Sequence, residues 1–194
     1  MNLLVLGPQG SGKGTQASRL AEEREIPHVS TGDMFRASIA ARTPLGRRVE
    51  PILASGELVP DELTVALIRE RLSEPDAARG FVLDGFPRNL AQAEALDAML
   101  TEIDRELDLV LFFDLDQVTS TERLRKRAVI EGRDDDTPDA IARRLELYHE
   151  QTAPLVELYR ASGRLVPIRA ERTIDEVANE IAEALELLDE EAVA

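Results

Sequence analysis

The sequence predicts an α/β fold in which helices cover both faces of a five-stranded parallel sheet. Five short apolar runs have the length and composition of buried parallel strands, and segments rich in helix-forming residues alternate with them. The first run leads through a glycine-rich turn into a helical segment, which is how α/β domains commonly begin. The strands are expected at residues 2–6, 28–30, 80–84, 107–113 and 165–168.

A long helical insertion separates the second and third predicted strands, from residue 31 to about residue 73. A plain alternating domain would not contain it. We expect this insertion to be interrupted at Pro44, Gly46, Gly56 and Pro60, and Asp61 to be the N-cap of its last helix.

The other helices follow from their own start signals and patterns. Thr137 precedes a proline, and Thr173 stands three residues before Glu176 in a capping box, so both residues start helices. The remaining helices are expected at residues 13–24, 89–100 and 117–127, and a polar stretch at residues 130–136 follows the last of these.

The composition is that of a single globular domain. The chain has 194 residues, of which 43% are hydrophobic and 31% charged, with no cysteine and a formal net charge of −15. This acidity disfavours nucleic-acid binding, which requires a basic face, and no apolar run approaches the roughly 18 residues that span a membrane. The lack of cysteine excludes disulfides and a zinc site of four cysteines, and it fits a reducing compartment. We therefore expect a cytoplasmic monomer without a signal peptide.

The turn after the first predicted strand has the pattern of a phosphate-binding loop. It reads GPQGSGKGT over residues 7–15. Glycine allows backbone N–H groups to curl around phosphate oxygens in conformations that a Cβ would forbid, and the next helix directs its N-terminal dipole at the anion. Lys13 would reach the β- and γ-phosphates of a nucleoside triphosphate. The residues expected to bind ATP here are Gly10, Ser11, Gly12, Lys13, Gly14 and Thr15.

Four segments, taken in order, resemble the motifs of the adenylate kinase family. They are GPQGSGKGTQ (7–16), STGDMFR (30–36), DGFPR (84–88) and YHEQTAPL (148–155), and the likeness extends over almost the whole chain. It implies a P-loop nucleoside triphosphate hydrolase-type fold and the transfer of the terminal phosphoryl group of Mg-ATP to AMP, giving two ADP. It also implies one kinase domain over residues 1–194, with a core at 1–29, 60–127 and 134–194, a monophosphate-binding flap at 30–59 and a short lid at 128–133.

For AMP, the resemblance implies that Thr31 and Gln92 contact the adenine, while Arg36 and Arg88 pair with the phosphate. Gln92 stands four residues after Arg88, on the same helix face, and its amide offers both a donor and an acceptor. The bond before Pro87 is expected to be cis. The implied AMP-binding residues are Thr31, Arg36, Glu57, Leu58, Val59, Gly85, Phe86, Pro87, Arg88, Gln92, Arg133 and Arg144.

For ATP and catalysis, the resemblance implies that Arg123 stacks on the ATP adenine, and that Asp84 orients water bound to Mg²⁺. Arg123 and Arg127 stand four residues apart, so both face one cleft. Arg172 is also implied to bind ATP, although Ala170 occupies a place where the family usually has glycine. The implied catalytic residues are Lys13, Arg88, Arg123, Arg127, Arg133 and Arg144, of which Arg127, Arg133 and Arg144 converge on the transferring phosphoryl group.

Three other functions compete with this interpretation, of which a nucleic-acid-binding NTPase is disfavoured by the acidity and by the presence of only seven aromatic residues. UMP/CMP kinases share the chemistry but tend to have Ala and Asn where this chain has Thr31 and Gln92. A P-loop module that binds nucleotide without transfer would not need DGFPR and the full set of arginines.

The expected reaction does not require a general base, because the nucleophile would be an already ionised phosphate oxygen of AMP. We therefore expect His28 and His149 to be structural.

Overall fold

The computed structural model describes residues 1–133 and 135–191 of the chain. Its five strands form one parallel sheet in the order β2-β3-β1-β4-β5, which confirms the predicted fold class. The expected strands are all present, although β3 and β4 begin one and two residues later than predicted. Their bounds are β1 (Asn2–Leu6), β2 (His28–Ser30), β3 (Phe81–Asp84), β4 (Leu109–Asp114) and β5 (Leu165–Arg169).

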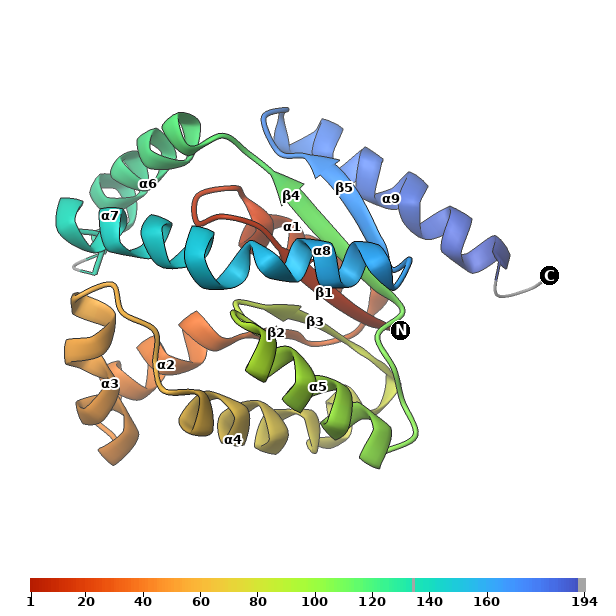
Figure 1. Ribbon diagram of the computed structural model, residues 1–194, viewed down its shortest axis with the longest axis horizontal. Helices are drawn as coiled ribbons and strands as arrows, with labels where there is room; N and C mark the ends of the chain where they lie inside the picture. The colour runs from red at the N-terminus through yellow and green to blue at the C-terminus, as the bar shows by residue number, and fades with distance from the viewer. Residues whose placement is uncertain (134, 192–194) are drawn as a thin grey trace.

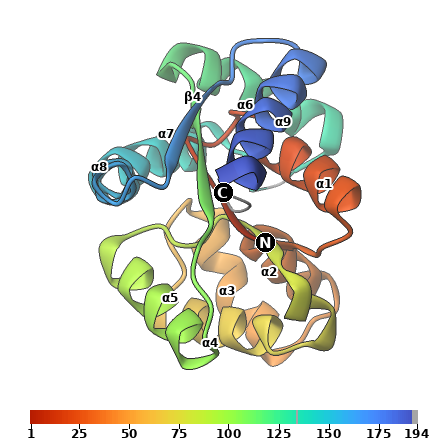
Figure 2. The same ribbon diagram turned by 90° about the vertical axis from the view of Figure 1, so that its right-hand side faces the viewer.

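Helices cover both faces of this sheet (Figures 1 and 2). Figure 2 looks along the sheet and shows α5 and α8 on one side and α1 and α9 on the other. Their bounds are α1 (Lys13–Arg24), α2 (Thr31–Ala40), α3 (Pro44–Ala54), α4 (Asp61–Leu72), α5 (Leu90–Glu102), α6 (Gln117–Glu131), α7 (Pro138–Leu147), α8 (Pro154–Ala161) and α9 (Ile174–Glu191). A 3₁₀ turn, η1 (Pro75–Arg79), precedes β3, and a π turn, η2 (Tyr148–Thr152), joins α7 to α8.

The two faces of the sheet have separate apolar cores because successive residues of a strand point to opposite sides. In the central strand β1, Leu4 and Leu6 pack toward α4, α5 and α8, whereas Leu3 and Val5 pack toward α1 and α9. All five residues of β1 are buried. A third apolar cluster, built around Phe35, Val49 and Val59, holds α2, α3 and the start of α4 together.

Most helices begin as the sequence signals predict. Thr137 accepts a hydrogen bond from Ala140 N, and the Thr173 and Glu176 side chains bond to each other's backbone N–H, so both predicted caps are confirmed. Other helices are capped in the same way by a side-chain oxygen that accepts from the backbone N–H three residues later. These caps are Ser30, Thr43, Asn89 and Asp116.

Two predictions within the insertion are wrong. Gly46 lies inside α3, and a Cβ there would stand 2.1 Å from Ser38 O, so this glycine permits close packing of α2 against α3 instead of breaking the helix. The N-cap residue of α4 is Pro60, whereas Asp61 is the first helical residue and its carboxylate binds side chains of the next helix.

The end of α6 also differs from expectation. The helix continues to Glu131, four residues beyond the predicted end at residue 127, and stops at Gly132 in a left-handed conformation with φ 61°. Most of the predicted lid at residues 128–133 is therefore a continuation of α6, which also includes the first two residues of the predicted polar stretch at residues 130–136. Residues 134 and 192–194, which are part of the predicted core, lie outside the described residues. None of the described helices has the length and apolar character needed to cross a membrane.

Candidate active site

The glycine-rich turn joins the end of β1 to the start of α1, as predicted. The backbone has a positive φ at Gly7, Gly10 and Gly12, a conformation that residues other than glycine rarely adopt. A Cβ at Gly7 would stand 2.6 Å from Phe113 O, and one at Gly10 would stand 2.8 Å from Ser120 O, so both positions also lack room. The buried hydroxyl of Ser11 has no hydrogen-bond partner within the described part of the chain. This loop has backbone groups and a hydroxyl available for an anion.

Lys13 lies over this turn, where its Nζ donates a hydrogen bond of 3.1 Å to Pro8 O. Burial, together with the charges of Arg88 and Arg127, lowers the pKa of Lys13 to about 8, although the charge of Asp84 opposes this shift. A bound anion would stabilise the charged form of Lys13, because a nearby opposite charge offsets the cost of burying the ammonium group.

Asp84 ends β3 beside the turn, with its Oδ2 3.6 Å from His28 Nε2 at the start of β2. Burial alone would raise the pKa of Asp84, but its contact with His28 and the charges of Lys13 and Arg88 lower it overall, so the carboxylate is ionised. Gly14 faces it, and a Cβ at Gly14 would stand 3.2 Å from Asp84 Oδ2. Glycine in place of the usual hydroxyl residue thus leaves space beside the carboxylate.

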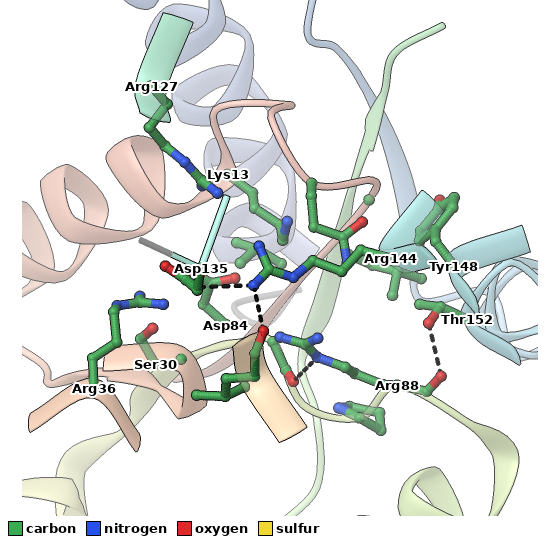
Figure 3. Close-up of a pocket in the computed structure, with 18 of the residues that line it drawn as sticks. Lys13, Ser30, Arg36, Asp84, Arg88, Arg127, Asp135, Arg144, Tyr148 and Thr152 are labelled. Carbon is green, nitrogen blue, oxygen red and sulfur yellow. Dashed lines mark hydrogen bonds and ion pairs between the residues drawn. The ribbon is translucent and has the colours of Figure 1, made fainter. Parts of the chain in front are cut away.

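A central cleft lies between these groups and the arginines. It is lined by Lys13, Ser30, Arg36, Asp84, Arg127 and Arg133, with Arg88 and Arg144 at its inner end and Gly10, Gly12, Gly14, Thr15 and Arg123 at its outer end. Figure 3 shows Lys13, Arg36, Arg88 and Arg144 directed toward one space. Burial and the charges of Arg144 and Arg36 lower the pKa of Arg88, so like charges crowd together in this cleft. Such crowding suits a multiply charged anion.

Two aspartates that the sequence analysis missed hold this cluster. Both side-chain nitrogens Nε and Nη2 of Arg127 donate to Asp136, at 2.8 and 2.9 Å, and Arg144 Nη1 donates to Asp136 Oδ1 at 2.6 Å. Arg144 also donates to Asp135 Oδ2 at 2.8 Å. The side chain of Asp136 is fully buried. An acidic run directly after Arg133 was the only local signal of this role.

The remaining arginines pair with acidic side chains or with backbone carbonyls. Arg36 donates to Asp33 and Arg133 donates to Glu131, at 2.5 and 2.6 Å. Arg123 of α6 donates to Ala170 O at 2.8 Å, so it ties α6 to the loop after β5. Arg172 stands 3.8 Å from Glu180 and does not line the central cleft, and the buried ring of Phe86 does not line it either.

A smaller side cavity opens between α2, the segment before α4 and the start of α5. It is lined by residues that include Thr31, Phe35, Glu57, Leu58, Val59, Gly85, Arg88 and Gln92. Thr31 Oγ1 donates to Gly85 O at 2.9 Å, and the Phe86–Pro87 bond that follows is cis as expected. The Gln92 carbonyl already accepts from Arg88 N at 2.8 Å, and its Nε2 donates to Asp61 Oδ1 at 2.7 Å. The sequence predicted that the Gln92 amide would offer both a free donor and a free acceptor. After these two hydrogen bonds, chiefly one N–H of the amide remains free.

A phosphate-binding turn at the carboxyl edge of a parallel sheet, with a cationic cleft above it, defines a P-loop nucleotide-binding protein. A model of the family described as adenylate kinase matches residues 5–164. The adenylate kinase of Stenotrophomonas maltophilia (strain K279a) is 46% identical over 185 residues, which are 95% of this chain and 99% of that protein. The adenylate kinase of Xanthomonas campestris pv. campestris (strain 8004) is 45% identical over the same shares of both chains. The chain belongs to the adenylate kinase family.

Proposed function

We propose that this protein reversibly transfers the terminal phosphoryl group of Mg-ATP to AMP and so produces two ADP. The observation that carries this proposal is that two groups suited to bind anions lie on opposite sides of one cleft. The glycine-rich turn with Lys13 is suited to a triphosphate, and the pair formed by Arg36 and Arg88 is suited to a monophosphate. Arg144 lies between them, and Arg127 lies on the side of Lys13 (Figure 3).

The chemistry requires position and charge rather than a base. An oxygen of the AMP phosphate, whose second pKa is about 6, is ionised at neutral pH and attacks the γ-phosphorus in line. A new P–O bond to AMP forms while the bond from the γ-phosphorus to the bridging oxygen breaks, and ADP leaves without needing a proton. Lys13, Arg88 and Arg144 would neutralise the negative charge that shifts between these oxygens.

We assign ATP to the outer part of the cleft and AMP to the inner part and the side cavity. ATP would be bound by residues 10–15 with Arg123 and Arg127, while Arg172 lies 3.8 Å from Glu180 and would have to turn toward the nucleotide. AMP would be bound by Thr31, Arg36, the backbone of residues 57–59, residues 85–88, Gln92, Arg133 and Arg144.

Asp84 has the properties that a magnesium site of this kind requires. It is ionised, it faces the phosphate-binding turn, and Gly14 leaves space beside it. The described residues contain no group of three His, Asp or Glu side chains arranged to hold a metal by themselves, so the phosphates and water would complete the coordination. Mg²⁺ bound with ATP would supply positive charge to the phosphates, and Asp84 would hold its water ligands.

Residues 30–59 would act as the flap over AMP and residues 128–133 as a short lid. The flap segment already touches α7, because Arg144 donates to Leu53 O at 3.1 Å and Arg143 donates to Glu57 at 2.6 Å. Closure of both segments would exclude water from the cleft. We further propose that the protein is a cytoplasmic monomer, which the absence of cysteine supports for the reducing compartment.

A coupled assay of ADP formation from Mg-ATP tests the proposal, with AMP, UMP, CMP and GMP offered in parallel. We expect a strong preference for AMP, and the variant Lys13→Met should lose on the order of 10²- to 10³-fold in rate. Preference for UMP or CMP would overturn the assignment of the base. ATP hydrolysis that does not depend on any monophosphate would overturn the transfer reaction itself.

A further inference from the structure

The carboxylate of Asp61 binds two side-chain amides at the start of α5, those of the N-cap residue Asn89 and of Gln92 in the first turn. It accepts from Gln92 Nε2 at 2.7 Å, and its two oxygens accept from Asn89 Nδ2 at 3.0 and 3.2 Å. Asp61 is the first residue of α4, where the helix dipole favours a negative charge. Through its hydrogen bonds, Asp61 links the segment after the cavity-lining residues 57–59 to the helix that carries Gln92.

These bonds settle the direction of the Gln92 amide. The backbone N–H of Arg88 needs an acceptor and the Asp61 carboxylate needs a donor, so the amide oxygen faces Arg88 and the NH₂ group faces Asp61. The reverse orientation would set donor against donor at Arg88 and acceptor against acceptor at Asp61. The bond to Asp61 is charge-assisted and hence the stronger of the two.

One N–H of Gln92 remains after these bonds. The side chain of Gln92 is 1% exposed and lines the side cavity, so little freedom is left for it to present any other group there. A base in the cavity therefore meets a hydrogen-bond donor. Adenine matches a donor with an unprotonated ring nitrogen, whereas hypoxanthine carries an N–H at that ring position and would set donor against donor.

We propose that Asp61 is a positioning residue for base selection, which acts by orienting Gln92 so that its free N–H faces the side cavity. The inference rests on the proposed function, because it takes the side cavity to be the site of the AMP base. Asp61 itself does not contact the nucleotide in this proposal. Its effect should therefore depend on Gln92, and it should concern the base rather than the phosphates.

The test compares AMP with IMP, which differ at the base edge alone, in the wild-type protein and in Asp61→Ala. We expect the variant to lower the AMP/IMP ratio of kcat/KM about tenfold, as for one lost hydrogen bond, and to raise KM for AMP by a similar factor. The KM for ATP should stay within about twofold. Asp61→Asn, which keeps one acceptor for Gln92, should recover part of the ratio. Glu62→Gln is the matched control for charge at the same helix end, since Glu62 is exposed and should leave the ratio unchanged.

A double-mutant cycle separates positioning from general loss of structure. On a Gln92→Ala background, Asp61→Ala should have no further effect on the AMP/IMP ratio. An equal effect on both backgrounds would overturn the proposal, and so would an unchanged ratio in a folded Asp61→Ala protein. If the wild-type protein does not phosphorylate AMP at all, the proposed function fails instead, and that outcome is visible before any variant is made.

Discussion

The hydroxyl of Thr152 donates a hydrogen bond of 2.8 Å to the backbone carbonyl of Arg88 (Figure 3). Thr152 ends the π turn η2, in which Ala153 N bonds to Tyr148 O at 2.8 Å, and such wide turns are frequent at functional sites. Both Tyr148 and Thr152 line the central cleft. The segment between α7 and α8 thus buttresses the backbone of the arginine assigned to the AMP phosphate.

We expect Thr152→Val to weaken AMP binding without changing ATP binding. Valine keeps the shape of threonine but removes the donor, so the Arg88 backbone loses one support, which is worth about 1 kcal/mol. Steady-state kinetics should show KM for AMP raised about three- to tenfold, with KM for ATP within twofold. Thr152→Ser retains the hydroxyl and should behave like the wild type. Equal behaviour of the Val and Ser variants would contradict the role of this hydrogen bond.

Arg88→Lys should show how far the planar guanidinium is needed. Arg88 Nε already donates to Gly85 O at 2.8 Å, which fixes the plane of the group toward the cleft. Lysine provides the charge but not the two-pronged contact with a phosphate. We expect kcat/KM for AMP to fall on the order of 10²-fold, the scale of losing one preorganised donor.

The matched control is Arg69→Lys, because Arg69 forms an exposed ion pair with Glu102 away from the cleft. That pair has little energetic value, and the variant should keep its activity within twofold. A similar loss of activity in both variants would show that the assay responds to general damage.

Asp136→Asn tests whether the cluster of arginines needs its buried counter-charge. The side chain of Asp136 is fully buried between Arg127 and Arg144, so the substitution removes the carboxylate partner of Arg127 and leaves Arg144 paired with Asp135 alone. Removing one partner of a buried ion pair typically lowers the free energy of unfolding by about 3 kcal/mol, and urea unfolding should show a loss of this size. Asp139→Asn, an exposed change at the start of α7, should be nearly neutral.

The same variant should respond more strongly to nucleotide. ATP and AMP would supply the missing negative charge, so the rise in Tm on adding nucleotide should be larger for Asp136→Asn than for the wild type. A smaller rise would indicate that the aspartate is needed to shape the site and not only to balance its charge.

Local patterns predicted the sheet, and they singled out residues that the structure brings together at the glycine-rich turn. Strand β1 and the glycine-rich turn are adjacent in sequence, so the apolar run, the turn and Lys13 could all be recognised together. Asp84 and Arg88 stand within one short motif at the end of β3, and the resemblance of that motif to the family implied their roles. In each case the residues lie close together along the chain.

Contacts between segments that are distant in the sequence determine the roles that the sequence did not indicate. Asp61 was expected to cap its helix, but its strongest partner, Gln92, lies 31 residues later. Asp136 acquires its role only where α6 and α7 meet. Gly46 was expected to interrupt the helix. The sequence does not show that α2 packs against α3 so closely that no Cβ fits at this position. No pattern within one segment carries these contacts.

Nucleotide affinity should depend on pH through Lys13. Its pKa is lowered in the folded protein from an ordinary value of 10.5 to about 8, chiefly by burial. Below pH 8, Lys13 is charged in both the folded and the unfolded protein, and the cost of burying the charge is present in full. As pH rises from about 8 toward 10.5, the folded protein loses this proton first, so this unfavourable contribution to stability is relieved.

ATP has the opposite effect, because its phosphates stabilise the charged form of Lys13. Binding above pH 8 must therefore take up a proton, and the Kd for ATP should rise by up to about tenfold per pH unit there. Isothermal titration calorimetry at pH 7, 8 and 9, in buffers of different ionisation enthalpy, measures both the affinity and the proton uptake. Lys13→Met should bind more weakly but lose the pH dependence above 8. If the wild type and Lys13→Met showed the same slope, another group would be responsible for it.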